Sequence, residues 1–262
     1  MDSVPPTRCD GTSPLPAELK NSVMLLGSFD GFHRGHQALL AAGRKEAKRL
    51  GVPLSILQFD PHPRVFFAGE TEFRLVAGAA RDLLVAQYGF ELVFAPLFDA
   101  RFANLEPEDF VGLYLVKHLA VSGVIAGPDF RFGRARKGNA SLLSELGARH
   151  GFQVQIADEV RHGTVRVSSS AIRTAIRSGR LDCAEKLLGR AWTTGLPSTV
   201  SGCCFPPEQV LPPPGQWHVT YMDRTGRSLR DGFLYLAEGR RVRLDAPDGT
   251  AMVRWNCASQ IG

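Results

Sequence analysis

The chain has 262 residues, of which 44% are hydrophobic and 22% are charged. These values are close to those of globular proteins and exclude a disordered or collagen-like chain. The length predicts one large domain or two unequal ones. No stretch approaches the roughly 18 consecutive apolar residues of a membrane helix. The first residues carry no apolar signal core, so we expect a soluble, cytoplasmic protein with no membrane partner.

The charge balance favours anionic partners. Lys and Arg number 31 against 26 Asp and Glu, which gives a net charge of +5. Residues 127–139 concentrate four basic side chains against a single acid, Asp129. A local basic cluster between glycines favours a small phosphate-bearing ligand over nucleic acid, so no nucleic-acid partner is predicted.

The five cysteines contain no C-x-x-C pair. A zinc site therefore has no support from spacing, and structural disulfides are not expected in a reducing cytosol. The adjacent pair Cys203-Cys204 is interpreted as two small residues in a loop or edge strand. The alternative is a redox or metal-capture pair.

Strands alternate with helices over the first three quarters of the chain. Residues 1–20 contain four prolines and little periodicity, and they are predicted to be a flexible lead-in. The alternation that follows predicts βαβ units and a doubly wound parallel sheet, an α/β fold. The predicted strands cover residues 22–26, 52–59, 91–94, 121–126 and 153–156, and the predicted helices cover 36–50, 80–88, 107–119 and 141–150.

The composition changes after Trp192. Six prolines occur between Gly195 and Gly215, and the segments beyond them alternate apolar and polar residues between turns. This pattern predicts short antiparallel strands at 217–221, 232–236, 241–244 and 251–255. The predicted domains are therefore the lead-in 1–20, an α/β domain over 21–192 and a small β module over 193–262. This module is expected to pack on the first domain or to mediate self-association.

A glycine-rich segment, Gly27–His36, follows the first predicted strand and opens the first helix. Ligands bind at the carboxyl ends of the strands in open α/β sheets. Glycines allow close approach of a phosphate, and a helix N-terminus offers free N–H groups. The alternative is two surface histidines near a turn. The predicted nucleotide-binding residues here are Gly27, Ser28, Phe29, Asp30, Gly31, His33, Gly35 and His36.

This H-x-G-H loop resembles that of the nucleotidyltransferase superfamily. The resemblance implies that His33 and His36 stabilise a triphosphate while its α-phosphorus is attacked. A second signal, Val167–Arg173, places three hydroxyls before a helix. An N-cap explains one of them, but three serines with Arg173 one turn later predict a second anion site, for the leaving phosphates. Ser168, Ser169, Ser170 and Arg173 therefore join the predicted ATP site, and the predicted catalytic residues are His33, His36, Ser170 and Arg173.

Two further stretches, Phe59–Pro63 and Ala126–Gly133, follow the second and fourth strands. With Gly138–Ala140 and Leu188–Arg190, they resemble the bacterial riboflavin kinase/FAD synthetase family over about residues 21–192. The resemblance implies the substrates ATP and FMN, the product FAD, and Mg²⁺ held mainly by substrate phosphates, with no protein metal site. The family usually has Thr where this chain has Gln58.

The aromatic loop is expected to bind the flavin. Phe130 and Phe132 can form an apolar slot for a flat isoalloxazine ring, and Arg131 or Arg134 can meet the ribityl phosphate. The alternative places both phenylalanines in the core. His62 is either a flap over the site or a brace between two prolines. The predicted flavin-binding residues are Phe59, Asp60, Pro61, His62, Gly127, Asp129, Phe130, Arg131, Phe132 and Gly133.

The predicted reaction needs no general base, because the FMN phosphate is mostly dianionic at neutral pH. The family's kinase half carries a G-x-P-T-A-N motif, which only Gly195–Val200 echoes here. Ser198 and Val200 replace its Thr and Asn, so the β module resembles a shortened, degenerate kinase barrel, without riboflavin kinase activity. The alternatives are a nucleotidyltransferase with another nucleotide (CTP) or a flavin-like acceptor, and a module that binds flavin or nucleotide without turnover.

Overall fold

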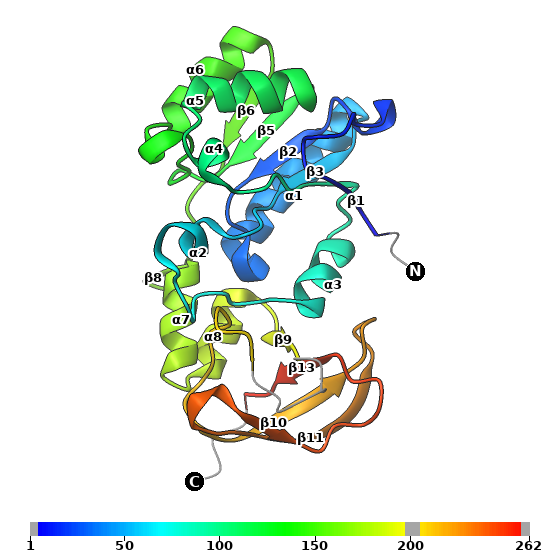
Figure 1. Ribbon diagram of the computed structural model, residues 1–262, viewed down its shortest axis with the longest axis vertical. Coiled ribbons are helices and arrows are strands. Elements are labelled where there is room, and N and C mark those ends of the chain that lie inside the picture. Colours follow the sequence, from blue (N-terminus) through cyan, green and yellow to red (C-terminus); the bar gives the residue numbers. More distant parts are fainter. Residues whose placement is uncertain (1–4, 197–204, 258–262) are drawn as a thin grey trace. The chain divides into compact units, whose positions relative to one another are not determined.

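The computed structural model describes residues 5–196 and 205–257 and divides into two compact units (Figure 1). The first unit comprises Met1–Phe29, Gly35–Gly69 and Tyr88–Val160, and the second comprises Asp30–Arg34, Glu70–Gln87 and Arg161–Gly262. The chain thus passes between the units several times. The boundary predicted after residue 192 lies inside the second unit.

Six parallel strands form the sheet of the first unit, in the order β1-β4-β3-β2-β5-β6. The strands β2, β3 and β5 are buried along their whole length, as expected where both faces of a parallel sheet are covered. The predicted parallel sheet is confirmed. Its strands are β1 (Thr7–Cys9), β2 (Val23–Leu26), β3 (Leu54–Leu57), β4 (Leu92–Phe94), β5 (Gly123–Ala126) and β6 (Gln153–Ile156).

The edge strand β1 corrects the prediction of a flexible lead-in. Thr7–Cys9 pairs in parallel with Leu92–Phe94. Backbone hydrogen bonds run from Thr7 N to Glu91 O over 3.0 Å and from Ala95 N to Cys9 O over 2.7 Å. A strand of three partly exposed residues is too short to show an alternating pattern, and its pairing comes from the neighbouring strand.

The three helices predicted for the first unit begin and end largely where the sequence predicts, whereas the short helices α2 and α4 have no counterpart among the predicted ones. Helix α1 ends before Gly51, and Asn139 caps α6 by accepting a hydrogen bond from Leu142 N over 2.9 Å. The predicted helix over 107–119 is α5, continued as a π-helical segment, Phe110–His118. The helices are α1 (Arg34–Leu50), α2 (Pro63–Ala68), α4 (Ala100–Ala103), α5 (Pro107–Asp109) and α6 (Ala140–His150).

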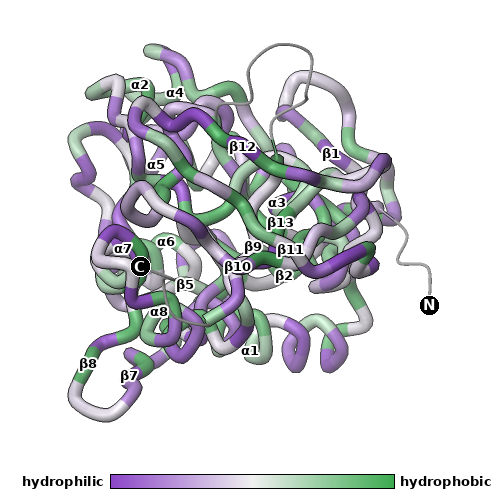
Figure 2. The backbone as a smooth tube through the Cα atoms, turned by 90° about the horizontal axis from the view of Figure 1, so that it is seen from below, coloured by the Kyte–Doolittle hydropathy of each residue, from purple (hydrophilic) through white to green (hydrophobic). Residues whose placement is uncertain are grey.

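The second unit contains the predicted antiparallel sheet, in the order β12-β11-β10-β13-β9. Its strands change repeatedly between hydrophilic and hydrophobic residues (Figure 2). Leu234 and Leu236 of β11 are buried, as are Trp217 and Trp255. Phe233 and Tyr235, on the other face of β11, are exposed. The strands are β9 (Thr193–Gly195), β10 (Gly215–Met222), β11 (Ser228–Leu236), β12 (Val242–Leu244) and β13 (Met252–Trp255).

Three helices and a short hairpin complete the second unit. The Ser168 side chain caps α7 by accepting a hydrogen bond from Ala171 N over 3.2 Å. Helix α8 ends at a left-handed glycine, Gly189. The elements are α3 (Ala79–Gln87), the hairpin β7 (Arg161–His162) and β8 (Val165–Arg166), α7 (Ser169–Arg177) and α8 (Leu181–Leu188).

Candidate functional site

The glycine-rich loop leaves β2 and makes a tight turn before α1. Phe29, Gly31 and Phe32 all have positive φ. At Gly31, φ is 78°, and a Cβ would lie 2.9 Å from Leu75 Cδ1. The loop therefore requires glycine at position 31 because of its backbone conformation and its packing on Leu75.

Asp30 anchors this loop from inside. Its carboxylate accepts hydrogen bonds from Leu75 N over 2.8 and 3.1 Å and from Val76 N over 3.4 Å. Arg173 Nη1 lies 3.4 Å from Asp30 Oδ2. Burial raises the pKa of Asp30 to about 6, and the Leu75 amide and the Arg173 charge oppose the shift. The Asp30 carboxylate is thus engaged by protein groups.

His33 is buried in the same loop. Burial lowers its pKa to about 4, and the positive charge of Arg173 contributes to the shift. The imidazole is therefore neutral at pH 7, so it can donate one N–H hydrogen bond to a phosphate oxygen but brings no charge. His36 lies in α1 of the first unit, where its ring centroid is 4.9 Å from that of Phe29.

The three serines before α7 have different contacts. Ser168 is the helix cap, as the sequence analysis allowed for one of them. Ser169 Oγ donates to the backbone oxygen of Asp30 over 3.4 Å. Ser170 Oγ accepts a hydrogen bond from Arg173 Nη2 over 3.3 Å. The two predicted phosphate motifs, 143 residues apart at Asp30 and Arg173, therefore contact each other in the second unit.

The segment Phe73–Val76, which carries no sequence motif, contacts both Asp30 and Arg173. Its backbone supplies the Leu75 and Val76 amides to Asp30, and the Phe73 carbonyl accepts a hydrogen bond from Arg173 Nη1 over 3.0 Å. Main-chain groups leave no signature in residue types, so the sequence could not reveal this role. We call Asp30, His33, Ser169, Ser170 and Arg173 the nucleotide cluster.

The first predicted flavin loop follows β3. Phe59 packs edge-on against Phe98 and Phe102, with ring centroids 5.1 and 5.4 Å apart. The Asp60–Pro61 peptide is cis. His62 Nδ1 accepts a hydrogen bond from Arg64 N over 3.2 Å and caps α2. This contact is the bracing role that the sequence analysis left open beside a flap.

In the second flavin loop, the two phenylalanines differ. Phe132 is buried in the core of the first unit, with its ring centroid 5.7 Å from that of Phe110. Phe130 is half-buried and stacks on Phe132 at 5.5 Å and 13°. The core alternative thus describes Phe132, whereas Phe130 keeps an accessible side. Gly127 and Gly133 are half-buried, and Asp129 and Arg131 are exposed.

A row of aromatic rings links the two flavin loops inside the first unit. The row runs from Phe59 through Phe102 and Phe110 to Phe132 and Phe130, with successive centroids 5.4, 6.0, 5.7 and 5.5 Å apart. The basic end of the second loop contacts one acid, because Lys137 Nζ lies 3.2 Å from Glu106 Oε2. Sequence analysis missed Phe102 and Phe110, which lie in helical segments without a motif.

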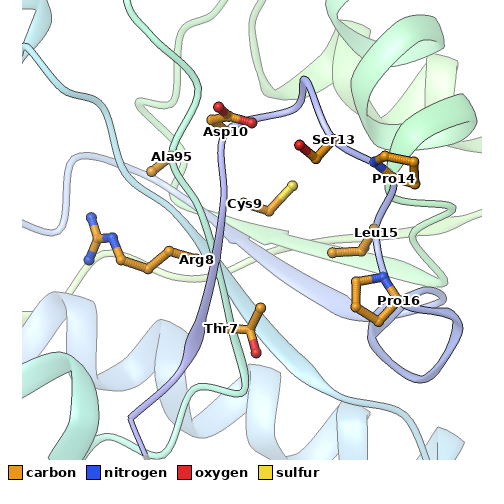
Figure 3. A pocket seen from close by; sticks show the side chains of 9 residues that line it. All are labelled: Thr7, Arg8, Cys9, Asp10, Ser13, Pro14, Leu15, Pro16 and Ala95. Carbon is orange, nitrogen blue, oxygen red and sulfur yellow. The ribbon is translucent and has the colours of Figure 1, made fainter.

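A cavity of about 360 Å³ lies at the edge strand β1, away from the predicted site residues (Figure 3). It is lined by Thr7–Asp10, Ser13–Pro16 and Ala95. The Cys9 thiol, which points between Ser13 and Leu15 in Figure 3, lies 3.3 Å from His118 Nε2. Cys203 and Cys204, the pair considered above, lie outside the described residues.

The structure describes residues 5–196 and 205–257. No group of three or more His, Cys, Asp or Glu side chains there could hold a metal ion. Across the same ranges, none of the helices combines the length and apolar character needed to cross a membrane.

Comparison with known proteins identifies relatives over two thirds of the chain. A family model described as FAD synthetase matches residues 15–171. The chain is 37% identical over 174 residues to a bifunctional riboflavin kinase/FMN adenylyltransferase of Escherichia coli K12, covering 66% of this chain and 56% of the relative. A Pseudomonas fluorescens protein of the same description is 39% identical over 180 residues, or 69% and 58%. The chain thus spans little more than half the length of these relatives.

A solved structure shares the fold. It is described as a macrolide-efflux protein from Streptococcus pneumoniae, and it matches with a TM-score of 0.80 at 21% identity. The match covers 96% of this chain and 90% of the solved one. The fold similarity therefore extends beyond the region that the sequence relatives match.

Proposed function

Because this chain belongs to the FAD synthetase family, we propose that it is an FMN adenylyltransferase, a nucleotidyltransferase that makes FAD and pyrophosphate from ATP and FMN. One observation carries the proposal. The two segments predicted to bind phosphate contact each other through Asp30 and Arg173, and the charge of Arg173 also acts on His33. Such a cluster suits the charge of a triphosphate.

The chemistry follows from these groups. A phosphate oxygen of FMN attacks the α-phosphorus of ATP, the bond from that phosphorus to the bridging oxygen breaks, and pyrophosphate leaves with the electron pair. His33, neutral at pH 7, would donate a hydrogen bond to a phosphate oxygen. Arg173 and the free N–H groups at the start of α7 would supply positive potential. The reaction would then depend on positioning and charge stabilisation.

Magnesium would enter with ATP. The Asp30 carboxylate is engaged by two amides and Arg173, and the described residues contain no metal-binding cluster. These residues fit an ion held by phosphate oxygens and water, as Mg²⁺ prefers. When bound, Mg²⁺ would neutralise part of the phosphate charge.

The decisive experiment uses purified protein with FMN, ATP and Mg²⁺, followed by chromatography for FAD and an assay for pyrophosphate. We expect FAD and pyrophosphate in equal amounts. CTP in place of ATP tests the nucleotide. Tight binding of FMN without any FAD would contradict the proposal and favour the non-catalytic module.

We also propose that the chain lacks riboflavin kinase activity. Ser198 and Val200 stand where the family's kinase motif has Thr and Asn, and valine offers no donor or acceptor to a metal or phosphate. These residues lie outside the described ranges, so the proposal rests on their side-chain chemistry.

A further inference from the structure

The backbone of Leu75 is held at both its N–H and its carbonyl group within the second unit. On one side, Leu75 N donates to both carboxylate oxygens of Asp30, over 2.8 and 3.1 Å. On the other side, Leu75 O accepts hydrogen bonds from Trp192 Nε1 over 2.7 Å and from Gln209 Nε2 over 3.1 Å. The two peptide groups of Leu75 thus connect the nucleotide cluster with residues that adjoin the C-terminal sheet.

The Gln209 contact belongs to a longer set of hydrogen bonds between two chain segments. Residues 206–210 run beside residues 72–75, with a parallel bridge between Arg74 and Gln209. Phe73 N and Arg74 N both donate to Glu208 O, over 2.9 and 2.7 Å, and Val210 N donates to Arg74 O over 2.9 Å. The Gln209 side chain is buried and also reaches Arg74 O over 3.0 Å.

Trp192 forms the second connection, and the C-terminal sheet fixes it. Its ring stacks on Trp255 of β13 with centroids 5.0 Å apart and planes at 24°. The backbone of Trp255 donates to Trp192 O over 2.9 Å. Both rings are almost fully buried, so the indole N–H that reaches Leu75 O has little freedom to move.

We propose that the C-terminal sheet positions Asp30, and with it the nucleotide cluster, through the backbone of Leu75, with Gln209 and Trp192 as positioning residues for adenylyl transfer. The Leu75 carbonyl, held by Trp192 and Gln209, fixes the peptide plane that also carries the Val76 amide. The Arg74 carbonyl, held by Gln209 Nε2 and Val210 N, fixes the plane that carries the Leu75 amide. Asp30 accepts hydrogen bonds from both amides. Asp30 in turn holds Arg173, which contacts Ser170. The inference rests on the proposed function for its catalytic consequence only.

The proposal predicts a change in the titration of Asp30. Its ionised form is stabilised by the Leu75 and Val76 amides and by the charges of Arg173 and Arg74, against the burial that raises its pKa to about 6. Loosening the backbone at Leu75 weakens the hydrogen bonds from the Leu75 and Val76 amides to Asp30. The pKa of Asp30 should then rise further, and activity should be lost at a higher pH as the solution is acidified.

The test compares Gln209→Met and Trp192→Phe, which remove the donors and keep most of the volume, with a control, Thr220→Val. Thr220 is a buried polar residue of the same sheet, and it bonds to Asp231 rather than to residues 72–76. The Asp30 carboxyl is titrated by carbon-13 NMR in full-length protein, FAD formation is followed against pH, and thermal melting confirms folding.

We expect both donor variants to raise the Asp30 pKa and to lower kcat at pH 7 by roughly tenfold, with the KM for FMN unchanged. Thr220→Val should lower the melting temperature without changing either pH curve. Folded donor variants whose Asp30 titration matches that of the wild type would overturn the inference. If the wild type makes no FAD, the proposed function fails, and the carboxyl titration still decides whether the sheet controls Asp30.

Discussion

His33 and His36 occupy different environments although only two residues separate them. His33 is buried beside the charge of Arg173, whereas His36 is half-buried in α1 and faces the Phe29 ring. In the proposed function, each histidine would donate a hydrogen bond to a phosphate of ATP. Their contributions should therefore be separable by mutation.

We expect His33→Ala and His36→Ala each to lower turnover at least about 100-fold, the scale of losing one donor to a developing charge. FMN affinity should change little, because neither residue belongs to the predicted flavin loops. Steady-state FAD formation and fluorescence titration of FMN measure the two effects. Normal turnover in both variants would exclude these histidines from the reaction.

The pKa of His33 has a consequence for stability. In the unfolded state, His33 has its ordinary pKa of about 6.5. In the folded state, its imidazole takes up a proton only near pH 4. Stability from the neutral imidazole is thus complete above pH 6.5 and is lost as the pH falls toward 4, by on the order of 3 kcal/mol at most. Asp30 has the opposite effect on stability. Because its folded-state pKa is raised to about 6, its contribution to stability increases as the pH falls below 6.

Replacing His33 by Gln should remove the acid-sensitive part of this balance. As the pH is lowered from 6.5 to 4, we expect the melting temperature of His33→Gln to increase steadily relative to that of the wild type. Calorimetry across this range gives the comparison, with His150→Gln as an exposed control. A constant difference at all pH values would show that His33 already titrates normally in the folded protein.

Among the elements, the start of α7 carries one serine with a structural role and one that we propose to act in ATP binding. Ser168 caps the helix, whereas Ser170 and Arg173 contact each other. We expect Ser170→Ala and Arg173→Ala to weaken binding of a non-hydrolysable ATP analogue, measured by isothermal titration. Ser168→Ala should instead cost about 1 kcal/mol of stability, the usual value of a cap. Wild-type affinity in both Ser170→Ala and Arg173→Ala would mean that they serve only the helix.

Elements with strong patterns could be predicted from the sequence. Apolar runs or alternation mark the strands β2 to β6 of the parallel sheet, and helical periodicity marks the four predicted helices. Strand β1, helix α2 and the hairpin β7–β8 are too short to show either pattern. The π-helical continuation of α5 has i→i+5 hydrogen bonds and a wider turn than an α-helix, and residue types do not encode this difference.

The candidate site shows the same division. The loops Gly27–His36 and Val167–Arg173 could be found because phosphate binding requires glycines, hydroxyls and helix starts. The contacts that join them could not, because they depend on the main chain of residues 73–76 and on Gln209, a lone amide in a proline-rich stretch. Phe132 was ambiguous, since an aromatic residue suits both a core and a flavin slot.

For the whole molecule, the proposed lack of kinase activity is a test of the C-terminal third. We expect riboflavin with Mg-ATP to yield neither FMN nor FAD, whereas FMN with Mg-ATP yields FAD. Kinase chemistry needs a phosphate cradle and a base for the 5′-hydroxyl, and Val200 removes one cradle group. Chromatography of both reactions gives the answer, and FMN formed from riboflavin as fast as FAD forms would contradict it.

The division of the second unit among three stretches of chain has a consequence for biosynthesis. Asp30–Arg34 leaves the ribosome early, but Arg173 follows 143 residues after Asp30, and Gln209 comes 134 residues after Leu75. At a synthesis rate of about 5–20 residues per second, these partners are made roughly ten seconds or more after residues 30–34. A nascent chain stalled before Arg173 should therefore expose residues 30–34 to protease, and release past Gln209 should protect them.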